Sequence, residues 1–385
     1  MKKLIVVVLV LAGLWGVMRL TLPGYLESNM NVVAHEPYVI SEEAQALHDT
    51  LFVADLHTDS LLWERDLTQR SERGHVDLPR LREGNVALQV FSATTKSPRG
   101  QNYASNTGDS DNITLLAVVQ GWPINTWRSL FARAQYQLDK LKQLAGEEAN
   151  KLVLVRTKQD MQRFLEARAR DREVVGAVYL IEGAHPLEGK LENLDALRNE
   201  GLHFVGITHF FDNALAGSLH GISQAGLSDF GRDVVRRAAE LEMSIDIAHV
   251  SPAAVPEILA LSDRPVILSH GGFKGICDTD RNFSDELMLA MAAQGGIIGV
   301  GYWDAAVCDA SPLGIVRSIR YGIDLLGVEH VALGSDYDGT IATPFDTSEL
   351  AILTQTMLDE GFTEQEIRAV MGENVKRFLL EQLPD

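Results

Sequence analysis

Seven side chains that can bind metal ions stand at the ends of short apolar runs in this chain of 385 residues. Runs such as Phe52–His57 and Pro265–His270 are largely apolar until they finish in histidine. Near-continuous apolar runs are typical of parallel strands that are covered on both faces. The seven residues are His57, Asp59, Glu182, His209, His249, His270 and Asp336. Because the carboxyl ends of the strands in a parallel barrel meet at one face, the pattern predicts a metal site at that face.

The types of these residues indicate hydrolysis assisted by a pair of metal ions. His57 and Asp59 are two residues apart on a strand, so their side chains point to one face and can bind one ion. Glu182 is placed to bridge to a second ion, which His249 and His270 would complete. Nitrogen and oxygen ligands without thiolates suit zinc, and manganese or cobalt would also fit. Two ions roughly 3.5–4 Å apart can share a hydroxide nucleophile and polarise a carbonyl group.

Helical patterns alternate with the apolar runs, and this alternation predicts a (β/α)8 TIM barrel rather than an open sheet. Helices are expected at residues 41–48, 191–201, 229–242, 252–262 and 284–294, where capping residues mark several of the ends. The eight expected strands are Phe52–His57, Val86–Ala93, Val174–Glu182, Phe204–His209, Ser244–His249, Pro265–His270, Gly296–Trp303 and Val331–Asp336. The remaining histidines lack a place at a strand end and are expected on the surface, in loops or around the site.

A long insertion separates the second and third expected strands. Residues 94–172 begin with a stretch rich in Gly, Ser and Asn at 97–112 and continue into a helical segment at 126–145. Residues 151–167 are expected to form a short strand and a helix. Long insertions are commonly lids or binding loops. Because this one leaves the carboxyl end of a strand, its first part is expected to lie over the metal site.

The N-terminus has the pattern of a secretory signal. Lys2 and Lys3 precede an apolar run at residues 4–18, which Arg19 closes. The run is short for a spanning helix, which needs about 20 apolar residues. No clear cleavage site follows it, however. A retained anchor is therefore favoured over a removed signal peptide. The sequence therefore predicts a signal peptide or anchor at 1–23, a tether at 24–37 and a catalytic domain at 38–385. The domain would be periplasmic or extracytoplasmic, held at the inner membrane.

Charge and cysteine content narrow the partners and the compartment. A formal charge of −19 argues against nucleic acid, since phosphate binding needs clusters of Lys and Arg that the sequence lacks. Cys277 and Cys308 are the only cysteines. In an exported protein an even pair favours a disulfide, which would join the loops after the sixth and seventh strands. Two buried free thiols are the alternative.

From about residue 41 to about residue 380 the chain resembles the membrane (renal) dipeptidase family of amidohydrolase-like barrels. That family has His-x-Asp on the first strand and a bridging glutamate in place of a carboxylated lysine, and this chain has both features. The matching motifs are Asp55-Leu-His57-Thr-Asp59, His75-Val-Asp-Leu-Pro-Arg80, Glu182-Gly-Ala-His185, His209-Phe-Phe-Asp-Asn213, Asp246-Ile-Ala-His249, Ser269-His270, Arg281-Asn282, Asp336-Tyr-Asp338-Gly339 and Met371-Gly-Glu-Asn374.

The resemblance implies a binuclear zinc dipeptidase that hydrolyses the amide bond of small dipeptides, some with a D- or dehydro residue at the C-terminal position. It makes His57, Asp59 and Glu182 ligands of one zinc ion. Glu182, His249 and His270 would hold the other ion.

Three further residues match functional positions of the family. His209 corresponds to the histidine that helps to hold the scissile carbonyl oxygen. Arg281 corresponds to the arginine that binds the C-terminal carboxylate of the substrate. Asp336 corresponds to the aspartate that orients the nucleophile and passes its proton to the leaving amine.

Two other classes of function stay open at this point. Another binuclear barrel hydrolase, such as a lactonase, phosphotriesterase or acyl-amino-acid hydrolase, would share the metal ligands, although Arg281 disfavours it. A barrel that only binds ligands would be expected to lack a metal ligand, and none is missing. The stretch Phe210–Ser218 departs from the tryptophan-containing segment of animal members, so the side-chain preference is open. The expected partners are a small dipeptide, the membrane and, as an alternative to a monomer, a second copy of the chain in a homodimer.

Overall fold

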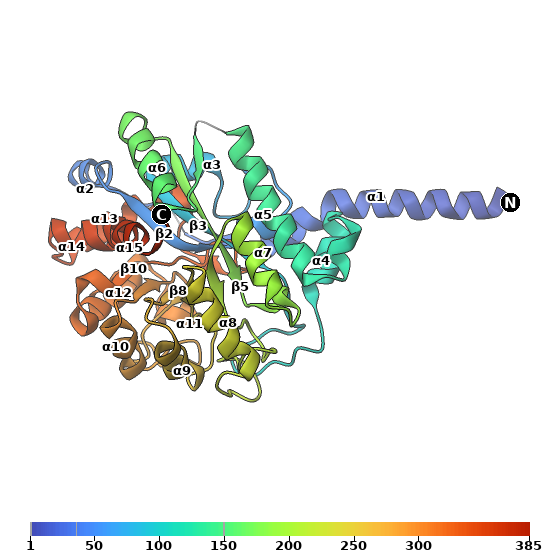
Figure 1. Cartoon of the computed structure of the whole chain (residues 1–385). Coiled ribbons are helices and arrows are strands. Elements are labelled where there is room, and N and C mark those ends of the chain that lie inside the picture. Colours follow the sequence, from blue (N-terminus) through green and yellow to red (C-terminus); the bar gives the residue numbers. More distant parts are fainter. Residues whose placement is uncertain (1, 36, 149–150) are drawn as a thin grey trace.

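Eight parallel strands close into a barrel with helices around its outside (Figure 1). The computed structural model describes residues 2–35, 37–148 and 151–385, except for the side chains of residues 2, 4–8, 10–12 and 14. In order around the barrel the strands are β2 (Val53–Thr58), β3 (Val86–Thr94), β5 (Val175–Glu182), β6 (Leu202–Gly206), β7 (Ser244–Asp246), β8 (Ile267–Gly271), β9 (Ile297–Val300) and β10 (Val331–Leu333). The ring closes where β10 pairs with β2, and the predicted (β/α)8 fold is confirmed.

The helices around the barrel begin where the sequence supplies N-caps. Ser41, Ser228 and Ser284 each accept a hydrogen bond from the backbone N–H three residues further on. These serines start α2 (Glu42–His48), α8 (Asp229–Glu240) and α10 (Asp285–Ala293). The other outer helices are α3 (Leu78–Glu83), α7 (Glu192–Glu200), α9 (Ala254–Leu261), α12 (Pro312–Leu326), α13 (Ala351–Asp359), α14 (Glu364–Arg368) and α15 (Asn374–Gln382).

The strands are buried on both faces. Every residue of β2, β3 and β5 is buried, because one face fills the barrel and the other packs beneath the helices. Inside the barrel, for example, Phe204 of β6 lies beside Leu180 of β5 and packs against Phe378 of α15, with ring centroids 6.3 Å apart. This burial explains why the strands appear in the sequence as near-continuous apolar runs.

The long insertion lies between β3 and β5 and contains more structure than the sequence predicted. It holds α4 (Asn112–Gln120), which the sequence did not indicate, the short helix at Ile124–Trp127, α5 (Leu130–Glu147), β4 (Leu152–Leu154) and α6 (Lys158–Arg170). The buried guanidinium of Arg133 on α5 donates to the carbonyl oxygen of Thr95 and to Asp111 Oδ2, both at 2.7 Å. Arg133 therefore ties the start of the insertion to its helical part.

The N-terminal helix α1 (Lys2–Met30) extends away from the barrel (Figure 1). Among the described residues, no helix combines the length and the apolar character needed to cross a membrane. The anchor expected at residues 1–23 falls largely on side chains outside the description, and it stays a prediction.

Part of the segment 24–37, which was expected to form a tether, carries regular structure. Residues 24–30 complete α1, and β1 (Val32–Val33) pairs in parallel with β11 (Ala342–Thr343). Residue 36 lies outside the described residues. One charged side chain of the segment, Glu27, is 1% exposed and forms ion pairs with Arg65 and Arg73.

Candidate active site

All seven metal-capable residues meet at the carboxyl ends of the barrel strands. His57 lies in β2, with Asp59 directly after this strand, while Glu182 ends β5 and His270 lies in β8. The other three follow their strands at a distance of three residues: His209 after β6, His249 after β7 and Asp336 after β10. His249 and Asp336 have φ values of 63° and 60°, in the left-handed region that non-glycine residues rarely adopt. Their strands therefore end earlier than predicted, and the backbone turns these two side chains back toward the barrel axis.

Glu182 is the centre of the cluster. Its Oε1 lies 3.7 Å from His57 Nε2, 3.2 Å from His249 Nε2 and 3.4 Å from His270 Nε2. Its Oε2 accepts a hydrogen bond from Thr94 Oγ1 at 2.7 Å. One carboxylate thus faces both halves of the predicted ligand set.

The first half of the set has the spacing of a metal coordination shell. His249 Nε2 and His270 Nε2 are 3.0 Å apart, and both lie within 3.4 Å of Glu182 Oε1. Ligands at about 2.0–2.1 Å from a tetrahedral zinc ion are about 3.3 Å from one another, so this triangle fits a zinc ion. Two neutral imidazoles that point lone pairs at each other repel, whereas a cation accepts both lone pairs.

The second half is more open and includes one carboxylate more than predicted. His57 Nε2 is 3.8 Å from Asp59 Oδ1 and 3.8 Å from Asp336 Oδ1. This buried nitrogen has no hydrogen-bond partner within the described part of the chain. Asp336 therefore lies within reach of an ion held by His57 and Asp59, as the acid–base role that the resemblance implies would need.

The electrostatics of the cluster favour an added positive charge. Burial disfavours charge on His57, yet the neighbouring carboxylates, Asp59 first and then Glu182, raise its pKa to about 10. Burial also raises the pKa of Asp336 well above its ordinary value, partly offset by His57. A position that attracts a proton so strongly is one where a metal ion can take the place of that proton.

Ser269 sets the orientation of two histidines, a role that the sequence did not predict. Its hydroxyl has one proton, which it donates to Asp246 Oδ2 at 2.6 Å. The Ser269 oxygen therefore accepts from the Nδ1–H groups of His270 at 2.9 Å and His57 at 3.3 Å. This assignment leaves both Nε2 atoms as acceptors that face the site, which is the tautomer that a metal ligand needs.

Asp55 fixes the strand ends beneath these ligands. Its Oδ1 accepts from the backbone N–H of His57 at 3.0 Å and from Gln89 Nε2 at 3.1 Å, and its Oδ2 accepts from the N–H of Ser335 at 2.9 Å. Burial raises the pKa of Asp55, and these donors oppose that rise. The contacts join β2 to β3 and to the loop that carries Asp336.

A cavity of about 420 Å³ lies over the cluster and contains Arg281. The guanidinium is buried, donates through Nη2 to the carbonyl oxygen of His270 at 2.6 Å, and lies 5.4 Å from the ring of Trp303. Its Nε and Nη1 atoms have no acceptor among the residues described here. No ion pair joins Arg281 to the nearby aspartates in the described chain, so two of its donor atoms keep unused hydrogen-bonding capacity beside the cavity.

The insertion covers this cavity, as its place after β3 predicted. Ser97, Asn102, Tyr103 and Ile113 line the cavity together with the metal cluster. The hydroxyl of Tyr103 accepts from Trp303 Nε1 at 2.8 Å. This hydrogen bond connects the insertion to the loop after β9.

The loops that carry Arg281 and Trp303 are joined covalently. In the structure Cys277 and Cys308 form a disulfide, with Cα atoms 5.5 Å apart. Asn282 Nδ2 donates to the carbonyl oxygen of Cys277 at 2.9 Å and to that of Ala306 at 2.8 Å. The position of Arg281 is thus held from both sides.

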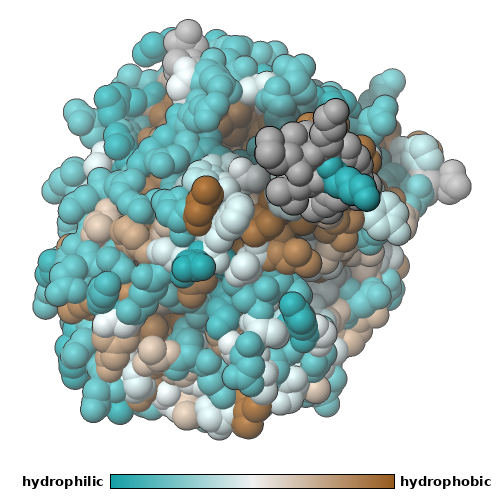
Figure 2. Space-filling view, turned by 90° about the vertical axis from the view of Figure 1, so that its right-hand side faces the viewer, coloured by the Kyte–Doolittle hydropathy of each residue, from teal (hydrophilic) through white to brown (hydrophobic). Residues whose placement is uncertain are grey.

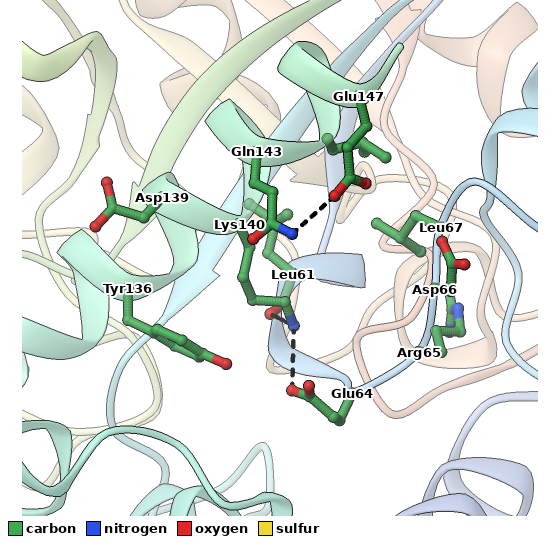
Figure 3. A pocket seen from close by; sticks show the side chains of 11 residues that line it. Leu61, Glu64, Arg65, Asp66, Leu67, Tyr136, Asp139, Lys140, Gln143 and Glu147 are labelled. Atoms are coloured by element: carbon green, nitrogen blue, oxygen red, sulfur yellow. Dashed lines mark hydrogen bonds and ion pairs between the residues drawn. The ribbon is translucent and has the colours of Figure 1, made fainter.

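A second cavity of about 480 Å³ lies between α5 and the loop after Asp59, and none of the seven metal-capable residues lines it (Figure 3). Within it, Lys140 Nζ donates to the carbonyl oxygens of Leu61 at 3.0 Å and Trp63 at 2.6 Å and faces Glu64 at 3.8 Å. Burial lowers the pKa of Lys140 to about 8. Lys140 therefore supports the turn that follows Asp59 from outside the metal site.

The family model described as membrane dipeptidase (peptidase family M19) matches residues 41–383. The chain belongs to this family. Members are metal-dependent hydrolases, so the enzyme class expected from the sequence is confirmed. The dipeptidase verJ of Clonostachys rogersoniana is 26% identical over 312 residues, which cover 79% of this chain and 75% of that protein.

Two further comparisons agree with the family. The dipeptidase aclJ of Aspergillus oryzae is 27% identical over 353 residues, covering 85% of this chain and 77% of that protein. A metallo peptidase from Rhodobacter sphaeroides, solved with a phosphinate mimic of the dipeptide L-Ala-D-Ala, has the same fold with a TM-score of 0.72 at 22% identity. That match covers 87% of this chain and 99% of the other.

Replacing Ser269 tests whether the hydroxyl holds the two histidines for metal binding. We expect Ser269→Ala to weaken metal affinity about 10- to 100-fold, the usual effect of losing a group that orients metal ligands. Titration of the metal-free protein with zinc measures this affinity, and Ser318→Ala, which removes a buried hydroxyl on α12 that does not line the site, is the matched control. Unchanged zinc affinity in Ser269→Ala would contradict the assignment.

Proposed function

We propose that this dipeptidase uses two metal ions, zinc in the first instance, to hydrolyse the amide bond of small dipeptides. The observation that carries the proposal is the shared position of Glu182 and Arg281 in one cavity. Glu182 faces imidazole nitrogens on both sides, and Arg281, whose Nε and Nη1 atoms have no acceptor among the described residues, lines the same cavity. His57 and Asp59 would hold one ion with Glu182, and His249 and His270 would hold the other.

When bound, the ions would activate water and polarise the scissile carbonyl group. The side chains of the protein supply the remaining functions. His209 Nε2, which lies 3.4 Å from Glu182 Oε2, is placed to donate to the carbonyl oxygen as charge builds on it. Asp336 would take a proton from the attacking water and deliver it to the leaving amine, a role that its raised pKa supports.

The preference for dipeptides would follow from Arg281. A guanidinium binds a carboxylate through charge-assisted hydrogen bonds, and the Nε and Nη1 atoms of Arg281 have no acceptor among the described residues. Only a substrate that ends one residue after the scissile bond would reach Arg281 with its carboxylate while the scissile carbonyl group lies at the metal ions. The Rhodobacter sphaeroides relative, solved with a mimic of L-Ala-D-Ala, supports dipeptides with a D-residue at the C-terminal position as the first substrates to test.

We also propose that α1 holds the enzyme at a membrane, with the barrel on the extracytoplasmic side. The apolar run at residues 4–18 follows Lys2 and Lys3, and α1 extends away from the barrel (Figure 1). Figure 2 looks along α1 from its N-terminal end and shows apolar surface beside the helix. Leu20 on α1, Leu115 on α4 and Ile124 are 86%, 63% and 76% exposed. Exposed apolar residues of this size favour contact with lipid.

The substrate clamp can be tested through the charge that it would bind. We expect Arg281→Ala to lower kcat/KM for a dipeptide by about 10²–10³ and to remove most of the discrimination between the dipeptide and its C-terminal amide. Arg281→Lys keeps the charge but loses the planar guanidinium. Its kcat/KM should therefore lie between those of the wild type and Arg281→Ala. If Arg281→Ala prefers the free acid as strongly as the wild type does, Arg281 is not the clamp. Wild-type enzyme that cleaves no dipeptide with metal present would refute the proposed function itself.

Flotation with vesicles of phosphatidylcholine and phosphatidylglycerol tests the membrane proposal. The intact chain should float with the vesicles. The double variant Leu9→Asp, Val17→Asp should stay in the dense fractions, because each aspartate in an apolar membrane segment costs about 2.5–3.5 kcal/mol. Val39→Asp, at a position that is 89% exposed outside α1, is the control. Wild-type protein that remains in the dense fractions would contradict the proposal.

A further inference from the structure

The segment that precedes the family domain reaches the active-site cavity. The family match begins at residue 41, yet Met30 lines the cavity together with Leu62, Ile113 and Ile341. Met30 is 43% exposed, so this large apolar side chain borders the cavity rather than the core. A residue outside the family domain thus forms part of the wall of the site.

Buried ion pairs fix this segment just before Met30. Glu27 forms ion pairs with Arg65 and with Arg73, the latter through Arg73 Nε at 2.6 Å. Arg65 also pairs with Asp338, which is fully buried and lies two residues after Asp336. Removing one partner of such a buried pair strands the other charge, so the pairs hold the end of α1 firmly.

Backbone contacts fix the segment just after Met30. Asn31 Oδ1 accepts from the N–H of Thr340 at 2.8 Å. The N–H of Val32 donates to the carbonyl oxygen of Ile341 at 3.3 Å, where β1 pairs with β11. Met30 is therefore held in place from both sides, against the loop that carries Asp336.

We propose that Met30 forms the wall of the subsite for the side chain of the substrate's N-terminal residue, and that this subsite selects apolar side chains. The inference rests on the proposed dipeptidase function, with the C-terminal carboxylate on Arg281. Arg281 follows β8, whereas Met30 lies beside the loops after β10 and β2. A dipeptide whose carboxylate binds Arg281 directs its N-terminal residue across the metal ligands and away from that arginine. Leu62, Ile113 and Ile341, which line the same cavity as Met30, are aliphatic.

Two series of dipeptides and the full-length protein test the inference. In the first series the N-terminal residue is Gly, Leu or Phe before a constant D-Ala, and in the second the N-terminal residue is constant and the C-terminal residue varies. Met30→Ala should lower the Leu-to-Gly ratio of kcat/KM about tenfold, the scale of an apolar pocket contact. The larger side chain in Met30→Trp should lower kcat/KM for dipeptides that begin with Phe or Leu and leave kcat/KM for those that begin with Gly unchanged. Neither variant should change the ratios in the second series.

Leu20→Ala, at an exposed position on the same helix that does not line the cavity, is the matched control. Glu27→Gln, which weakens the fixing of Met30, should lower the Leu-to-Gly ratio in the same direction as Met30→Ala. Because Met30 is half-exposed, its variants should fold, and thermal unfolding checks this. Unchanged ratios in both Met30 variants, or changes confined to the second series, would overturn the inference about Met30. The proposed function would still stand in that case, provided that the wild type cleaves dipeptides. A wild type that cleaves no dipeptide overturns the proposed function, and this inference with it.

Discussion

The Glu182 carboxylate is buried among imidazole nitrogens at the carboxyl end of the barrel, and the rest of the site depends on that position. Its Oε1 lies between 3.2 and 3.7 Å from three histidine nitrogens. Asp59 and Asp336 add two more carboxylates within 3.8 Å of His57. Several buried carboxylates in one cavity repel one another and lose hydration, a cost that cations between them would offset. Metal binding is therefore the simplest explanation of why so many ionisable groups share this space.

The surrounding residues keep these ligands in one arrangement. Ser269 and Asp246 set the tautomers of His57 and His270, so that the Nε2 atoms of both rings point into the site with their lone pairs. Asp55 joins the strand ends beneath them. At the outer rim, the disulfide and the insertion fix the loops around the cavity, and the N-terminal segment packs against the loop that follows Asp336. Several of these contacts, such as those of Ser269 with His57 and of Asp55 with Ser335, connect chain segments that are far apart in sequence.

The fold and the meeting of the seven metal-capable residues at one face could be predicted because they depend on local patterns. An apolar run that ends in histidine or a carboxylate marks a strand and its functional end together, and the barrel topology then brings all such ends to one face. The bends at His249 and Asp336 could not be predicted, since non-glycine residues adopt positive φ only under tertiary constraint. Ser269 has an unremarkable place in the sequence, and its role depends on two rings that approach it in space. The packing of residues 24–35 was missed because a polar segment gives no sign that its charges find buried partners.

Counting the metal ions in matched carboxylate-to-amide variants tests the central role of Glu182 most directly. Elemental analysis of the purified wild type should give about two ions per chain, as a shared carboxylate requires. Glu182→Gln should lose ions from both halves of the site, because a neutral amide cannot bridge two cations. Asp336→Asn should keep about two ions while its kcat falls about a hundredfold or more, as for a positioned acid–base group. Glu182→Gln protein that retains both ions, or wild-type enzyme that stays active without bound metal, would contradict this account.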